Sequence, residues 1–194
     1  GLALADPDLA EAVADKVGGA ARIVWAADAP LSVQSFTLGG ADYGLTVQGD
    51  ATVSERTLLL DGSAALSADD LSRFGGLAGR PLEGAAEIRL AGQGDVLGGT
   101  FDLEFDLEGE GLAIGQDLAD RFLDGPVTLS AAASRDLEGT ALERLELDST
   151  GVGATASGRL GGEAGALQFD VALADLGLIR PDLQGPIRVT GQAQ

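Results

Sequence analysis

The chain of 194 residues carries 31 acidic and only 12 basic side chains, and its net charge of −19 excludes the clustered cations that nucleic-acid binding requires. Because Cys and His are both absent, thiol catalysis, disulfides, imidazole general bases and thiolate or imidazole metal sites are excluded as well. The 30 Gly residues, with only 4% aromatic residues, favour a thin, turn-rich β-architecture over a compact core, and the acidic surface is interpreted as a source of solubility.

The ends of the sequence indicate a piece of a longer protein. The chain starts with Gly1, contains no Met and stops in the polar run 190–194. No apolar run approaches the ~18 residues that cross a bilayer. We therefore treat residues 1–194 as a single elongated β-repeat region, a fragment whose parent protein extends beyond it.

The first half of the chain predicts two short helices, each followed by strands. Residues 8–17 repeat an apolar residue every four positions, which is typical of a short amphipathic helix. Apolar and polar residues then alternate at 36–38 and 43–48, on either side of a Gly-Gly pair. Because side chains alternate across a strand, we expect two strands there. A second short helix is expected at 69–77, and the alternation returns at 86–91 as a further strand.

The clearest strand signal is residues 100–110, which read T-F-D-L-E-F-D-L-E-G-E. One face of such a strand carries only Phe and Leu, whereas a helix would scatter these residues around its axis. A short helix is expected next at 117–123, where an acidic residue near the start suits the helix dipole. Pro181 predicts a turn or a broken helix over 173–181. The remaining predicted strands are 142–156, 167–174 and 187–189.

Self-comparison reveals an internal repeat. An apolar residue, one spacer and Gly precede an alternating segment four times, beginning at Val17, Leu82, Leu123 and Leu183. A shift of 109 residues also aligns 36–49 with 145–158 without a gap. The irregular spacing of the four copies excludes a strict short-period β-helix. Two mostly-β architectures remain open, an elongated β-groove of stacked units with a few short helices and a closed β-sandwich, and the helix before most copies favours the first.

No motif for catalysis, metal binding or nucleotide binding is found in the sequence. Carboxylate pairs such as Asp102/Asp106 are so frequent that a solvated strand face explains them more simply than a glycosidase-type acid/base pair. Residues 39–43 resemble a calcium β-roll repeat only faintly, and no stretch has the EF-hand spacing. The segment 92–94 lacks the third Gly of a phosphate loop, and no usual serine triad forms without His. We therefore predict that the chain is not an enzyme and uses no cofactor.

Two segments resemble the repeats of a known family. Residues 70–92 read D-L-S-R-F-G-G-L-A-G-R-P-L-E-G-A-A-E-I-R-L-A-G, and residues 142–160 read L-E-R-L-E-L-D-S-T-G-V-G-A-T-A-S-G-R-L. Both are similar to the repeats of the TamB family, the translocation and assembly module subunit, and of its AsmA-like relatives. The resemblance covers most of the chain and lies in the texture and order of the repeats, since the family has no invariant signature.

The resemblance implies a long, taco-shaped β-groove without catalytic residues. Members of this family are anchored in the inner membrane of Gram-negative-type bacteria, cross the periplasm and meet a barrel protein of the outer membrane, a TamA-like partner. They move phospholipid toward the outer membrane or assemble outer-membrane and autotransported proteins. A fragment of this length lacks the anchor and the partner-binding end, so these attributes would belong to the parent protein.

An open apolar groove can hold the acyl chains of phospholipids while their head groups stay in water. The residues expected to line it are the apolar members of the alternating segments: Phe36, Leu38, Leu45, Val47, Ile88, Leu90, Phe101, Leu103, Phe105, Leu107, Leu145, Leu147, Val152, Phe169, Val171, Ile187 and Val189. Trp25 and Tyr43 are interpreted as anchors of strand packing, with a lipid-facing or groove position as the alternative.

Two other functions remain open from the sequence. One is a surface-exposed adhesin or binding module built from closed sandwiches and dependent on calcium. The other is an acidic polysaccharide-processing enzyme with carboxylate catalysis. The apolar face is either an open groove or a closed core, and these two arrangements lead to different functions.

Overall fold

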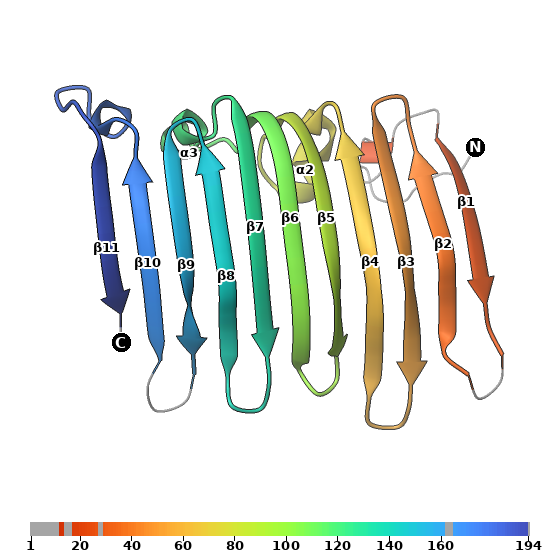
Figure 1. Cartoon of the computed structure of the whole chain (residues 1–194). Helices are drawn as coiled ribbons and strands as arrows, with labels where there is room; N and C mark the ends of the chain where they lie inside the picture. Colours follow the sequence, from red (N-terminus) through yellow and green to blue (C-terminus); the bar gives the residue numbers. More distant parts are fainter. Residues whose placement is uncertain (1–11, 14–16, 27–28, 162–164, 194) are drawn as a thin grey trace.

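The computed structural model describes residues 12–13, 17–26, 29–161 and 165–193. Within them, eleven strands form one antiparallel sheet in which each strand pairs with its neighbours in the sequence, from β1 at one edge to β11 at the other (Figure 1). The strands are β1 (Gly18–Val24), β2 (Leu31–Gly39), β3 (Tyr43–Val53), β4 (Leu58–Ala68), β5 (Glu83–Asp95), β6 (Thr100–Ala113), β7 (Pro126–Arg135), β8 (Thr140–Ser149), β9 (Val152–Leu160), β10 (Ala166–Leu173) and β11 (Ile187–Ala193).

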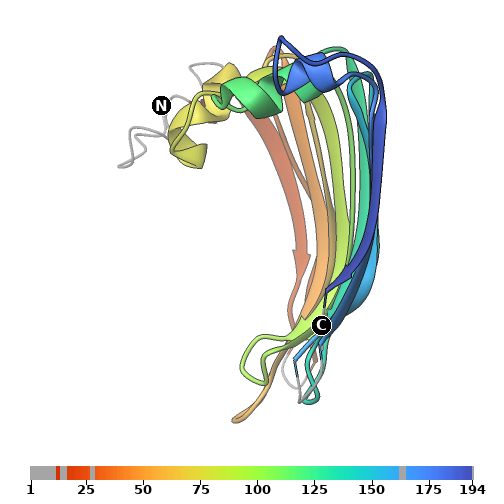
Figure 2. The same ribbon diagram turned by 90° about the vertical axis from the view of Figure 1, so that its left-hand side faces the viewer.

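The sheet is a single curved layer. The strands bow along their length, so that the sheet has a concave and a convex face (Figure 2). The protein exposes 12548 Å² of surface, whereas a compact monomer of this mass would expose only about 8500 Å². No second sheet covers either face in the described part of the chain. The predicted elongated, open β-structure is therefore confirmed, and the closed-sandwich alternative is wrong.

The cross-strand register explains why the alternating residues form these strands. Phe105 of β6 lies opposite Leu90 of β5 and Ala131 of β7. Residues directly opposite each other point to the same face, so each apolar side chain of the alternation meets an apolar neighbour. A slip of one residue would move the apolar set of a strand to the other face, and the pattern therefore specifies the register.

Short helices lie on the concave side of the sheet, along one end of its strands (Figure 2). We call this end the helix edge, and the opposite end, where the strands are joined by hairpin turns, the hairpin edge (Figure 1). They are η1 (Leu71–Phe74), α2 (Gly75–Ala78), α3 (Asp117–Phe122) and η2 (Leu176–Leu178). They occupy the β4–β5, β6–β7 and β10–β11 connections, which confirms the helices predicted at 69–77 and 117–123 and the broken helix near Pro181. Most of the helix predicted at 8–17 lies outside the described residues. The helices that the structure describes are too short to span a bilayer.

The repeated Gly residues begin three of the strands. Gly84, Gly125 and Gly185 precede or open β5, β7 and β11, and their φ angles are 94°, 87° and 94°. These angles fall in the region that favours glycine, so each Gly lets the chain turn from the helix edge into a new strand. Gly19, in the copy that begins at Val17, lies within β1 and has no such angle. That copy therefore matches the other three in sequence but not in backbone conformation.

The 109-residue shift relates two hairpins, β2–β3 and β8–β9. Both turn at the helix edge without an intervening helix. Each also has an irregular register at the corresponding place, between Val33 and Phe36 in the first hairpin and between Leu142 and Leu145 in the second. The repeat thus preserves the position of a β-bulge as well as the pattern of apolar side chains.

The buried core is small and lies beneath the helices. Ala86, Leu112 and Val127 are buried, and Leu71 of η1 and Leu123 at the end of α3 pack against them. These contacts join the helix edge to the concave face. No large side chain is fully buried anywhere in the described residues, which is the consequence of a one-layer fold.

The two predicted aromatic anchors have different environments. Tyr43 is buried at the helix edge, where its hydroxyl donates a hydrogen bond to the Val13 carbonyl at 2.8 Å and its ring packs edge-on against Phe74. The packing interpretation therefore holds for Tyr43. Trp25 follows β1 at the opposite edge and is 80% exposed, so the packing interpretation is wrong for Trp25.

Candidate functional site

All seventeen residues predicted to line a groove lie on the concave face. Fourteen occupy three central cross-strand rows, and Phe101, Val152 and Ile187 occupy the outer rows. Each central row contains only apolar residues or Gly and crosses all eleven strands. The middle row is Ala21, Phe36, Val47, Ala64, Leu90, Phe105, Ala131, Leu145, Ala156, Phe169 and Gly191.

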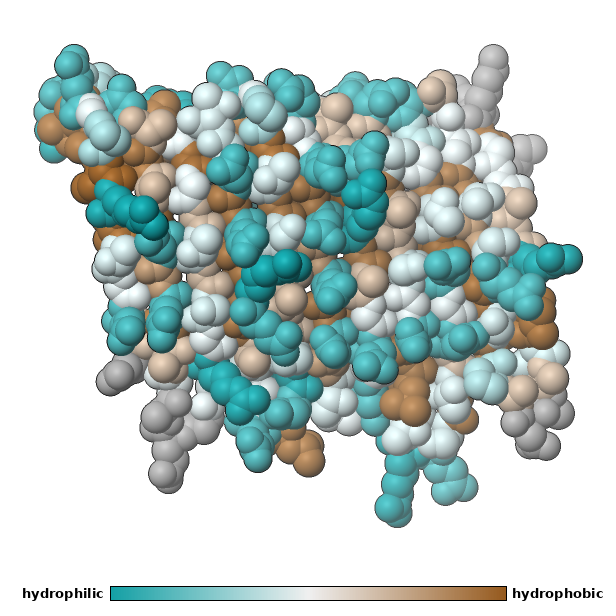
Figure 3. Space-filling view, viewed as in Figure 1, coloured by the Kyte–Doolittle hydropathy of each residue, from teal (hydrophilic) through white to brown (hydrophobic). Residues whose placement is uncertain are grey.

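The convex face of the same strands is polar. Figure 3 shows hydrophilic side chains spread over most of this face, with apolar residues between them and at its margins. Arg89 contacts the carboxylates of Glu87 and Glu108 at 2.8 and 3.5 Å, and Arg188 contacts that of Asp170 at 2.8 Å. Exposed ion pairs of this kind contribute little to stability, so the convex face mainly keeps the sheet in solution.

The apolar face is covered only at its helix edge. Val127, beneath the helices, is 2% exposed, whereas Leu90 in the middle row is 42% exposed. Soluble proteins rarely leave a large contiguous apolar surface exposed unless it binds something. The open part of the concave face is therefore the candidate functional site.

A depression of about 320 Å³ lies within this open part, over β2–β6. Its floor is formed by Gly49, Gly62 and Gly92, which lie opposite one another on three adjacent strands. A Cβ atom on Gly92 would lie 2.2 Å from the carbonyl oxygen of Asp102, so the backbones there approach too closely for a larger residue. The apolar residues that line the depression include Leu31, Val33, Val47, Leu60, Leu90 and Leu103.

Sequence reasoning missed this depression because it treats Gly residues as signs of a turn-rich chain, as part of the repeat or as a possible phosphate loop, and not as places where strands approach closely. The available signal was that Gly49, Gly62 and Gly92 each lie inside a run of strand-forming residues, where Gly indicates a close approach of backbones. Their alignment across three strands depends on the register, and the sequence pattern alone does not say which residues lie opposite each other.

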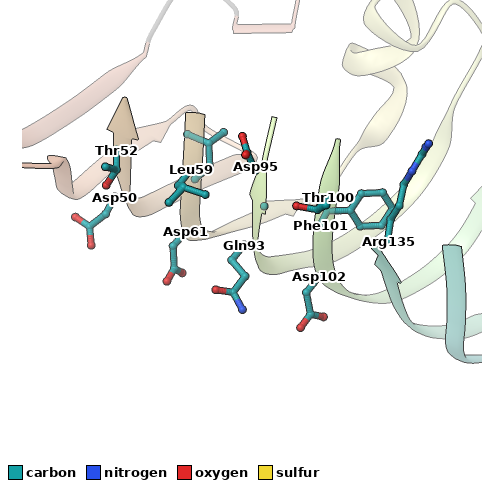
Figure 4. Close-up of a pocket in the computed structure, with 12 residues that line it drawn as sticks. Asp50, Thr52, Leu59, Asp61, Gln93, Asp95, Thr100, Phe101, Asp102 and Arg135 are labelled. Atoms are coloured by element: carbon teal, nitrogen blue, oxygen red, sulfur yellow. The ribbon is translucent and has the colours of Figure 1, made fainter. Parts of the chain in front are cut away.

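A second depression, of about 490 Å³, is lined mainly by side chains of the convex face. Figure 4 shows Asp50, Asp61, Gln93 and Asp102 pointing the same way from neighbouring strands. Asp50 lies directly opposite Asp61, an arrangement in which like charges repel. No group of three or more acidic side chains is placed to hold a metal ion in the described residues. This carboxylate row is therefore an acidic surface rather than a candidate centre for chemistry.

Two of the carboxylates with a lowered pKa serve hairpin turns. Hydrogen bonds from the backbone N–H groups of Gly98 and Leu58 lower the pKa of Asp95 in the β5–β6 hairpin. Hydrogen bonds from the N–H groups of Glu138 and Gly139 lower the pKa of Asp136 in the same way. Both carboxylates lie at hairpin turns, where such hydrogen bonds are common for Asp.

Comparison of the chain with protein-family models, curated proteins and solved structures finds no match. No residue role is therefore transferred from another protein. The three apolar rows of the concave face remain the feature on which a function can be based.

Proposed function

We propose that this chain is a segment of a non-enzymatic scaffold that holds phospholipid acyl chains on its concave face. The observation that supports this function is the set of three apolar rows, which cross all eleven strands of a one-layer sheet. In line with the TamB-like resemblance, the segment would serve phospholipid transport or outer-membrane protein assembly in the periplasm. Its parent would be anchored in the inner membrane and would meet an outer-membrane barrel partner through regions outside this fragment.

The hydrophobic effect makes such a surface attractive to acyl chains. Each methylene removed from water contributes about 0.8 kcal/mol. Eleven strands at a spacing of about 4.8 Å give a path roughly 48 Å long. No charged residue interrupts the three rows, so an acyl chain can move from strand to strand without passing a charge. A lining of mostly aliphatic residues suits acyl chains of different lengths better than one shaped ligand.

Adjacent alanines in β7 provide the test of this function. Ala131 lies in the middle row of the concave face, and Ala132 points to the convex face of the same strand. We expect Ala131→Glu to abolish binding of a phosphatidylcholine with a fluorescent acyl chain to the purified protein, because a carboxylate would interrupt the apolar rows. Ala132→Glu adds the same charge on the other face and should leave binding unchanged. Absence of binding to the unmodified protein, or equal loss in both variants, would contradict the proposal.

The adhesin alternative depended on closed, calcium-dependent sandwiches. The described strands instead form one open sheet, and no observation in the described residues favours that alternative. Thermal unfolding with and without a chelator separates the two functions. We expect the same melting temperature in both conditions, whereas a large fall on chelation would favour the adhesin.

A further inference from the structure

Arg135, the last residue of β7, brings a positive charge to the margin of the concave face. It lies opposite Phe101 of β6 and Thr140 of β8. Phe101 belongs to the apolar side of β6, so the register places Arg135 on that side too. Figure 4 shows the Arg135 side chain next to the Phe101 ring, at the rim of the depression of about 490 Å³, which Arg135 lines together with Asp50, Asp61, Asp95 and Asp102.

The guanidinium of Arg135 has no ion-pair partner among the residues that the structure describes. The nearby carboxylates at the hairpin edge have other contacts. Asp95 accepts hydrogen bonds from the backbone N–H groups of Leu58 and Leu97. One carboxylate oxygen of Asp136 accepts hydrogen bonds from the backbone N–H groups of Glu138 and Gly139. Its other oxygen lies 3.8 Å from the guanidinium of Arg159. The Arg135 guanidinium can therefore bind an anion from outside the protein.

Apolar surface continues directly from Arg135 toward the helix edge. Ala133 is the next residue of β7 on the same face, and it lies between Leu103 of β6 and Leu142 of β8. Leu103 also lines the depression of about 320 Å³ on the concave face. A cation at the margin and an apolar surface beyond it are complementary to a molecule with an anionic head and an acyl tail.

We propose that Arg135 binds the phosphate of a glycerophospholipid whose acyl chains lie on the concave face. This inference rests on the proposed function and deepens it, because it assigns one side chain of the concave face to the phosphate of the head group. A guanidinium donates two parallel hydrogen bonds to a phosphate, and its aliphatic stem packs on apolar neighbours such as Phe101. The head group then lies at the hairpin edge, with the tails directed toward the helix edge.

Two lipids with identical tails test the assignment. Phosphatidylcholine and diacylglycerol, both with oleoyl chains, are used to displace a fluorescent fatty alcohol, which carries no charged head group, from the purified protein. We expect phosphatidylcholine to be effective at about tenfold lower concentration, the effect of a hydrogen bond to a charged group. Arg135→Gln should remove this preference and leave displacement by diacylglycerol unchanged. Arg135→Lys, which keeps the charge without the planar fork, should retain part of the preference.

Arg144→Gln is the matched control, because Arg144 lies opposite Ala132 on the convex face and its loss should leave the preference intact. Equal displacement by the two lipids, or a preference that survives Arg135→Gln, would overturn the inference and leave the proposed function standing. Failure of both lipids to displace the probe would overturn both. Loss of the preference when inorganic phosphate is added at the concentration of the lipid would assign the site to free phosphate and overturn the lipid assignment.

Discussion

The two halves of β6 differ in exposure because the helices cover only one end of the concave face. Leu112 lies beneath the helix edge and is 8% exposed, whereas Leu103 on the same strand is 37% exposed. Both are leucines on one strand, so neither residue type nor secondary structure accounts for the difference. Gly109 makes room for the covered residue, since a Cβ atom there would lie 2.7 Å from the Leu112 side chain. The core forms only where a connection turns back over the sheet.

This difference separates structural residues from candidate binding residues on a single face. The covered margin joins the helical connections to the strands beneath it, because Leu71 and Leu123 pack against the buried cluster of Ala86, Leu112 and Val127. The open part has no such partner and depends on pairing between neighbouring strands. Stability in such a repetitive fold arises mostly from contacts between neighbouring units, so the open face is free for ligands.

The same substitution at the two leucines gives the largest expected contrast. Leu112→Ala removes buried methyl groups and leaves a cavity, and we expect the free energy of unfolding to fall by about 2–5 kcal/mol. Leu103→Ala removes side-chain atoms that are already partly in water, and we expect a fall of about 1 kcal/mol or less. Urea unfolding followed by circular dichroism measures both. Equal losses would mean that the helices do not define the core.

Two glycines at the helix edge provide a smaller contrast. Gly84 begins the turn into β5, and a Cβ atom there would lie 2.4 Å from the carbonyl oxygen of Gly111. Gly79, after α2, also has a positive φ, of 63°, but its Cβ would meet open space. We expect Gly79→Ala to cost about 1 kcal/mol from the backbone angle alone. Gly84→Ala should cost more, up to roughly 3 kcal/mol, because a contact with the backbone is added.

Urea unfolding of the two glycine variants also checks the repeat. If Gly84→Ala is no more destabilising than Gly79→Ala, then the L-x-G motif marks a turn without constraining how the next strand begins. Gly125→Ala should also lower the free energy of unfolding, as Gly84→Ala does, because Gly125 has a φ of 87° and both glycines open a strand after a helix.

Much of this fold could be predicted from the sequence because its information is local. The alternation at 100–110 specifies both faces of β6, and the Gly residue in three of the L-x-G copies adopts a similar φ angle, between 87° and 94°. The predicted concave-face residues share one face because period-two alternation propagates through antiparallel pairing. Such inference works best in a meander, where each strand pairs with its neighbours in the sequence.

The parts that could not be predicted depend on contacts between distant residues or on curvature. The exposure of Trp25 follows from its place at a hairpin edge that nothing in the described residues covers. The Gly49–Gly62–Gly92 floor requires the register of three strands. Arg135 resembles any other arginine in the sequence, and only its pairing with Phe101 places it on the apolar side. Composition and periodicity carry no information on these points.

A substitution on the convex face should give the smallest change in the free energy of unfolding, and this change should be a gain. Asp61 lies opposite both Asp50 and Gln93, and we expect Asp61→Asn to raise the free energy of unfolding by about 0.2–1 kcal/mol through loss of like-charge repulsion. Asp102→Asn is the control, because Asp102 lies opposite Gln93 and Ser134 and has no carboxylate across from it. Urea unfolding at low and high salt should show the gain for Asp61→Asn shrinking as salt screens the repulsion. A loss of stability in Asp61→Asn would contradict the repulsion between the two carboxylates.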